Sequence, residues 1–195
     1  MQLQSFYQRN FYTGLLVFLS CILQSSYSLA QDDSVDIHID KTNQVLTVQR
    51  GDTVIKSYRV ATGKGGHGTK RIIGDKKTPI GVYKIIDFKD DSKFHYFMQL
   101  DYPNLLDAWY GYKNKVISAS EFKKISMAYK NDGKPPQDTR LGGYIGIHGI
   151  GVENTQKLQI HEDINWTDGC IALTNEQVNE LKKYVGIGTK VIIKE

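Results

Sequence analysis

Cysteine is scarce in this sequence: its 195 residues include only Cys21 and Cys170. That number excludes the disulfide framework of small secreted domains, which is built from several bonded pairs. A lone cysteine in the folded part of a chain is either a buried, inert side chain or a thiol whose reactivity is used. Cys170 has to be judged between these two interpretations.

Acidic residues are absent from the first thirty positions, where the only charged residue is Arg9. The apolar stretch at 11–23 is shorter than the roughly 20 residues that span a membrane. It is followed by the small-residue pattern Ser-Leu-Ala at 28–30. A basic start, a short apolar run and small residues before the cut are typical of a secretory signal. We therefore predict a signal peptide at 1–30 and an exported mature domain at 31–195, in the periplasm or cell envelope.

Two alternatives for this leader stay open. It is an uncleaved N-terminal anchor if the cut is not made. It is a lipoprotein signal if Cys21 becomes lipidated, although Phe18 and Leu19 fit that signal poorly. Cleavage after residue 30 removes Cys21 and leaves Cys170 as the single thiol of the mature chain.

A large excess of either charge is also missing. The chain has 25 basic and 21 acidic residues, and its hydrophobic and charged fractions of 40% and 24% are those of an ordinary globular domain. The excess is too small for a nucleic-acid-binding surface. The glycine-rich segment 63–70 (GKGGHGTK) lacks the Gly-Lys-Ser/Thr ending of a phosphate loop, so we expect a flexible surface loop there.

Short strands dominate the mature domain. Apolar and polar residues alternate in 35–39, and further strands are predicted at 45–48 and 54–60, with a hairpin turn at Gly51-Asp52. This opening is an antiparallel meander. Later strands are expected at 82–88, after the turn Thr78-Pro79-Ile80-Gly81, at 144–148, and at 190–194 as an edge strand.

Capping residues indicate three short helices among these strands. Asn104 is expected to cap a helix through Tyr112. Ser118 and Glu121 have the spacing of a capping box, before a helix that ends at Asp132-Gly133. A last capped helix is predicted over 174–185. The fold class is thus mostly β, with short inserted helices.

Two residues carry the chemistry. His148 ends a strand and shares a face with Gly146, whose missing side chain leaves a gap, so His148 is predicted to border a cleft. Cys170 follows Gly169, which permits backbone torsions that other residues avoid. A histidine near a thiol can take its proton or lower its pKa, which activates it as a nucleophile.

These motifs resemble the L,D-transpeptidase catalytic domain family, also called the YkuD domain. The resemblance rests on His148-Gly149, on the run Thr167-Asp168-Gly169-Cys170, and on Thr-Pro-Ile-Gly at 78–81, and it spans nearly the whole mature chain. It implies a β-sandwich or barrel-like domain that acts on peptidoglycan stem peptides through an acyl-enzyme. Neither a metal nor an organic cofactor is implied.

Roles for individual residues follow from this resemblance. Cys170 would be the nucleophile and His148 the general base and acid. Gly149, Thr167, Asp168 and Gly169 would form the substrate-binding and oxyanion part of the site, with backbone N–H groups around Asp168 as donors. The acyl group would pass from D-alanine to an amine acceptor or a wall-attached protein. The oligomeric state is left open.

The sequence departs from the family at two positions. Many members have histidine where Asp168 stands, and arginine or asparagine where Ala172 stands. Such departures resemble a sub-branch that includes a hydrolase releasing proteins from peptidoglycan. Transpeptidation therefore competes with two alternatives: hydrolysis by an L,D-carboxypeptidase or amidase, and a non-catalytic wall-binding module.

Other candidates have weaker support. His161 is expected to be a solvated side chain in a long loop, and the spacing of His148, His161 and Cys170 fits no common zinc site. Several aromatic residues could line a groove, although each is expected to serve packing: Tyr102, Trp109, Tyr110, Tyr112 and Trp166.

Overall fold

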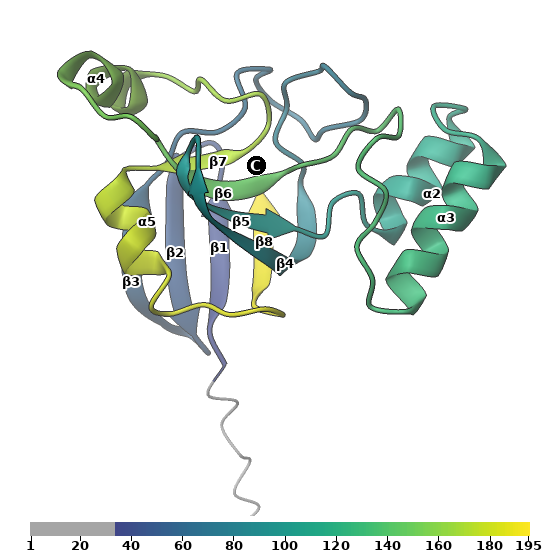
Figure 1. Cartoon of the computed structure of the whole chain (residues 1–195), viewed down its shortest axis with the longest axis horizontal. Coiled ribbons are helices and arrows are strands. Elements are labelled where there is room, and N and C mark those ends of the chain that lie inside the picture. The colour runs from purple at the N-terminus through teal and green to yellow at the C-terminus, as the bar shows by residue number, and fades with distance from the viewer. Residues whose placement is uncertain (1–33) are drawn as a thin grey trace, which may run out of the picture. The chain divides into compact units, whose positions relative to one another are not determined.

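The structure is a computed structural model that describes residues 34–195, so the predicted signal peptide and Cys21 lie outside the described residues. It confirms the mostly β prediction: eight strands form one sheet, accompanied by four short helices (Figure 1). The strands are β1 (Asp36–Asp40), β2 (Val45–Arg50), β3 (Thr53–Arg59), β4 (Gly81–Ser92), β5 (His95–Leu100), β6 (Gly146–Gly149), β7 (Ile171–Leu173) and β8 (Lys190–Lys194). The helices are α2 (Leu105–Lys113), α3 (Ala119–Lys130), α4 (Thr155–Asp163) and α5 (Asn175–Leu181).

The first three strands form the predicted antiparallel meander. In β1 the apolar side chains of Ile37 and Ile39 are buried, and the polar residues between them are partly exposed. This alternation fixes the register, because a slip by one residue would turn the apolar side chains to solvent. The last strand was predicted at the edge of the sheet, which is wrong. β8 lies between β1 and β4, parallel to β1, and is central.

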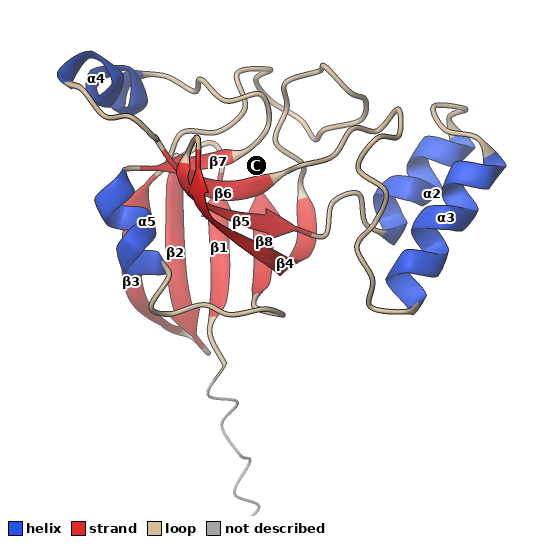
Figure 2. Ribbon diagram, in the orientation of Figure 1, coloured by secondary structure: helices blue, strands red, loops and turns tan. Residues whose placement is uncertain are grey.

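β4 connects the two halves of the sheet. Its first part pairs with β8 and its second part with β5, and the register shifts between Ile85 and Asp87. The order continues through β6 to β7. Ala61, just after β3, then exchanges both backbone hydrogen bonds with Ala172 of β7, at 3.1 and 2.8 Å. The two ends of the sheet therefore meet, as expected for a barrel-like domain (Figure 2).

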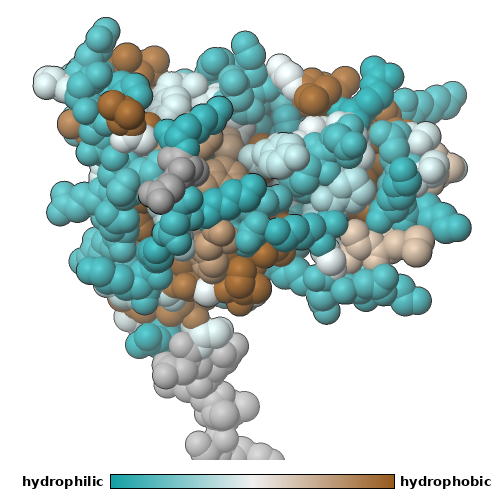
Figure 3. Space-filling view, viewed as in Figure 1, coloured by the Kyte–Doolittle hydropathy of each residue, from teal (hydrophilic) through white to brown (hydrophobic). Residues whose placement is uncertain are grey.

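The helices pack in different places. α2 and α3 are capped by Asn104 and Ser118, as predicted, and share a small core of their own that includes the fully buried Ile125. α5 adds Val178 to the main core. The prediction of a long loop from His148 to Gly169 is wrong, because α4 lies in this segment. None of the described helices is long and apolar enough to cross a membrane. On the face shown in Figure 3, polar side chains surround small apolar patches.

Candidate active site

The motif loop before β7 orients Cys170 through its own hydrogen bonds. The buried Thr167 hydroxyl donates to the Cys170 carbonyl at 2.7 Å and accepts from the Gly169 N–H at 3.2 Å. Gly169 has a φ of 131°, and a Cβ there would lie 2.8 Å from the Lys77 carbonyl oxygen. Only glycine fits this position without strain. Thr167 therefore shapes the loop, and its hydroxyl is used within it.

A second segment supports the motif loop from behind. The Lys64 N–H donates to the Thr167 carbonyl at 2.9 Å, and the Gly63 N–H donates to the buried Thr78 hydroxyl at 2.8 Å. A Cβ on Gly63 would lie 2.3 Å from the Lys76 carbonyl oxygen. The expected surface loop is confirmed in part, because Lys64, Gly66 and His67 are exposed, whereas these contacts hold the first residues of the segment against the Thr-Pro-Ile-Gly turn and the cysteine motif.

A cleft of about 450 Å³ opens beside the Cys170 thiol. Its walls come from the β4–β5 hairpin (Lys89, Lys93, Phe94, Phe97), the segment before β6 (Gly143, Tyr144, Ile145) and the motif loop (Asp168, Cys170). Cys170 is half-buried, and its thiol donates to the Tyr144 carbonyl oxygen at 3.4 Å. The protein atoms packed around the sulfur raise the pKa of the thiol to about 11, because burial disfavours the thiolate.

His148 lies on the same face of the sheet as the thiol. β6 and β7 are parallel, with His148 opposite Ala172. Cys170 directly precedes β7 and lies two residues before Ala172, so strand alternation places its side chain on the face of the sheet that carries the imidazole. His148 Nδ1 lies 2.7 Å from the Gly149 carbonyl oxygen. A carbonyl can only accept, so Nδ1 carries the proton and Nε2 keeps its lone pair.

Aromatic rings enclose this imidazole. Phe94 stacks on it at 4.2 Å between ring centroids, Phe97 lies parallel at 6.0 Å, and Trp166 meets it edge-on at 6.0 Å. His148 is only 1% exposed. The prediction that it borders a cleft through a gap at Gly146 is wrong, because the Phe97 ring fills that gap and would lie 2.6 Å from a Cβ there.

Burial reverses the expected electrostatics of the pair. Desolvation lowers the pKa of His148 to about 4, outweighing the hydrogen bond to the Gly149 carbonyl, which raises it. The sequence left two roles open for the imidazole, which could take the thiol proton or lower the thiol pKa. In the structure the pKa of Cys170 is raised, which argues against the second role. Both groups are therefore neutral at pH 7, and Nε2 of His148 is available as a base.

The prediction for His161 is also wrong. It lies in α4, is 3% exposed, and accepts a hydrogen bond at Nδ1 from the Trp166 indole N–H at 3.3 Å. The predicted solvated side chain is thus buried, and it orients the ring that covers His148. Among the described residues, no cluster of three or more His, Cys, Asp or Glu residues could hold a metal ion.

The remaining motif residues have distinct surroundings. Gly149 allows close packing, since a Cβ there would lie 2.5 Å from the Asn175 side-chain oxygen. Asp168 is exposed and pairs with Lys64 at 3.0 Å. Ala172, where many family members carry a polar side chain, is fully buried at the seam where the sheet closes.

The residues that form the walls of the cleft were not predicted from the sequence. Phe94, Phe97 and the two lysines come from the β4–β5 hairpin, whose second strand was not predicted. None of the five aromatic residues proposed for a groove lines this cleft. Trp166 alone among them contacts His148, whereas Tyr102 is buried and donates to the Leu141 carbonyl.

Nearly all of the described residues match a single protein family. The model of the L,D-transpeptidase catalytic domain family (YkuD) matches residues 34–193. YafK of Escherichia coli (strain K12), a candidate L,D-transpeptidase, is 25% identical over 144 residues, which are 72% of this chain and 42% of YafK.

Two solved structures are also similar to this chain. The helical cell shape determining protein Pgp2 from Campylobacter jejuni superposes with a TM-score of 0.56 at 26% identity, over 84% of this chain and 49% of Pgp2. Bd1075 from Bdellovibrio bacteriovorus has the same fold, with a TM-score of 0.51 at 20% identity, over 87% of this chain and 50% of its own. This chain spans half or less of each relative.

Proposed function

Because this chain belongs to the YkuD family of L,D-transpeptidase catalytic domains, we propose that it is a cysteine-dependent L,D-transpeptidase acting on peptidoglycan stem peptides through an acyl-enzyme. One observation carries the proposal. The Cys170 thiol opens on a peptide-sized cleft, and on the same sheet face His148 has its Nδ1 bound to a carbonyl, so that Nε2 is a free acceptor. Nucleophilic catalysis at an amide needs a thiol and a base on one side of the substrate, and the shared sheet face supports this assignment.

Acylation begins from the neutral pair. The thiol turns from the Tyr144 carbonyl toward the imidazole, and Cys170 Sγ bonds to the carbonyl carbon of the substrate amide while His148 Nε2 takes the thiol proton. The C–N bond then breaks, and Nε2 returns the proton to the leaving amine, D-alanine in the family's reaction. An amine acceptor attacks the thioester carbonyl carbon and loses its proton to Nε2. The C–S bond then breaks, and Nε2 returns this proton to the sulfur of Cys170.

Donors to the developing oxyanion are restricted by the loop. The Gly169 N–H is occupied by the Thr167 hydroxyl. The backbone N–H groups of Cys170 and Asp168 are therefore the candidates to stabilise the negative charge.

Product analysis tests this function. The purified protein is incubated with muropeptides, with and without an amine acceptor, and the products are identified by mass spectrometry. Acceptor-linked peptides that are absent with Cys170→Ala support transpeptidation. Shortened peptides without acceptor transfer would make the enzyme a carboxypeptidase or amidase that uses the same acyl-enzyme. Unchanged muropeptides that still bind would contradict catalysis and favour a wall-binding module.

We also propose export, with cleavage after residue 30, from the leader pattern in the sequence. Protein recovered from the cell envelope should begin at Gln31. Detection of Met1, or of a lipid on Cys21, would overturn this part of the proposal and indicate an anchored protein.

A further inference from the structure

The β4–β5 hairpin contributes two cationic side chains to the cleft. Lys89 and Lys93 line it together with the apolar rings of Phe94 and Phe97. Among the described residues, the ion pairs involve other lysines and neither of these two. On the motif loop, the carboxylate of Asp168 is already paired with Lys64. Among the side chains that the structure describes, these two ammonium groups therefore have no carboxylate partner in the cleft.

Lys93 stands close to the reactive groups. Its Nζ lies 4.9 Å from the centroid of the Phe94 ring, and the same ring stacks on His148. Burial is the main cause of the lowered pKa of His148 and the raised pKa of Cys170, and the Lys93 charge acts on both groups in the lowering direction, which places it within electrostatic reach of both. The apolar walls formed by Phe94 and Phe97 strengthen such an interaction relative to open solvent, because they reduce the local dielectric constant.

We propose that Lys93, assisted by Lys89, forms an anion subsite that binds a substrate carboxylate beside the amide attacked by Cys170. The proposal rests on the proposed function for the identity of the substrate as a peptide. The cleft of about 450 Å³ admits a peptide segment, and a carboxylate is the anionic group such a segment carries. A flexible ammonium can follow the carboxylate as the substrate settles against the aromatic wall.

Matched alkylating reagents test the subsite without any peptidoglycan. Iodoacetate and iodoacetamide deliver the same carbon to the thiolate and differ in one negative charge. Their rate ratio cancels any change in the thiol pKa. The ratio is measured on the full chain at low ionic strength, from the mass spectrum of the peptide containing Cys170, and is divided by the ratio for N-acetylcysteine amide.

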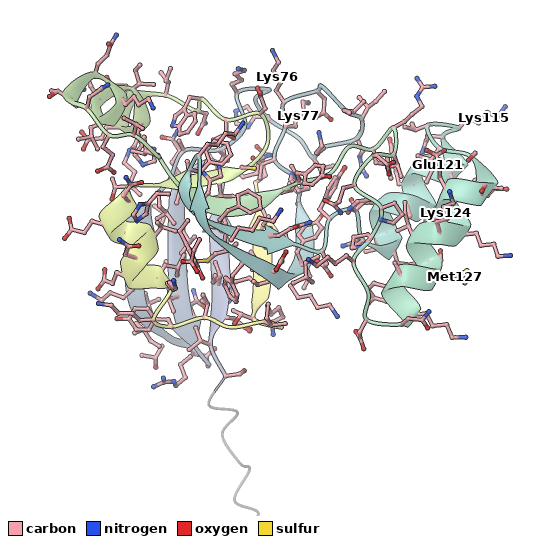
Figure 4. The ribbon with its side chains drawn as sticks, in the orientation of Figure 1. Lys76, Lys77, Lys115, Glu121, Lys124 and Met127 are labelled. Carbon is pink, nitrogen blue, oxygen red and sulfur yellow. The ribbon has the colours of Figure 1, made fainter. Side chains whose placement is uncertain are left out.

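We expect this normalised ratio to favour iodoacetate about five- to tenfold in the wild type and to fall toward one in Lys93→Gln, with Lys89→Gln giving a smaller drop. High salt should reduce the preference. Lys124→Gln is the matched control, because Lys124 lies on α3 in the helical pair (Figure 4) and does not line the cleft. Equal ratios in wild type and Lys93→Gln, or an equal drop in Lys124→Gln, would overturn the subsite.

A second measurement separates this inference from the proposed function. Stem peptides with a free carboxylate and their carboxamides are compared as substrates. Lys93→Gln should raise the KM of the carboxylate form about tenfold and leave that of the carboxamide unchanged. If the thiol is charge-selective but the protein processes neither peptide, the anion subsite is supported and the proposed function is rejected. Turnover with no difference between the two peptides would retain the function and reject the subsite.

Discussion

Alkylation of Cys170 should show that the resting pair is neutral. With a thiol pKa of about 11 in the fold, the thiolate fraction at pH 7.5 is about 0.03%, against about 10% for an unperturbed cysteine with a pKa near 8.5. Iodoacetamide should therefore react with Cys170 about 300-fold more slowly than with a free cysteine at this pH. The rate should rise with pH through pH 9 without a plateau.

His148→Ala separates the two roles that an imidazole can have. The neutral ring does not lower the thiol pKa, so alkylation at pH 9 should be unchanged or faster in the variant. Peptide acylation should nevertheless fall by at least about 100-fold, because the general base is lost. A wild-type alkylation profile with a midpoint near pH 6.5 would refute the neutral pair. So would a His148→Ala variant whose alkylation slows as much as its turnover.

Three further predictions follow from the site. Cys170→Ala should abolish turnover while circular dichroism and the unfolding midpoint stay near those of the wild type; retained activity would remove Cys170 as nucleophile. Gly169→Ala should lower the free energy of unfolding by about 1–3 kcal/mol and reduce activity, because Gly169 has a φ of 131° and lies against the Lys77 carbonyl. Gly186→Ala is the control, and it should be close to neutral in urea unfolding because the space around Gly186 is open. The pKa of His148 is lowered to about 4 in the folded protein, so the free energy of unfolding should fall as the pH drops from 6.5 toward 4, by up to about 3 kcal/mol. His148→Gln should lack this fall when urea unfolding is compared at pH 7 and pH 5.

Local patterns in the sequence were sufficient for the early strands and the helix starts. Alternation in β1 and the capping residues Asn104 and Ser118 act within a few residues, so they can be read directly. β5 was missed because five of its six residues are buried, which leaves no alternation to detect. The central place of β8 depends on pairing with β1, from the opposite end of the domain, and no local signal records it.

The site, too, could be predicted only in part from local patterns. Cys170 and His148 could be selected from residue types and neighbouring glycines, and the sheet register places both on one face. Their protonation could not be predicted, because it depends on rings that arrive from elsewhere. Phe94 precedes His148 by more than fifty residues in the sequence, yet it stacks on the imidazole at 4.2 Å and helps to desolvate it. A pKa is set by burial as much as by the neighbouring ionisable group.

The two departures from the family pattern have a joint consequence for the proposed reaction. Ala172 is fully buried, lies opposite His148, and exchanges backbone hydrogen bonds with Ala61 where the sheet closes, so no polar side chain reaches the site from that position. Asp168 pairs with Lys64 and supplies no second imidazole. In the proposed reaction, Nε2 of His148 would therefore take both the proton of the thiol and the proton of the acceptor. Because the ring is neutral at rest, transfer and hydrolysis would use the same base. The outcome then depends on which acceptor occupies the cleft beside the thioester.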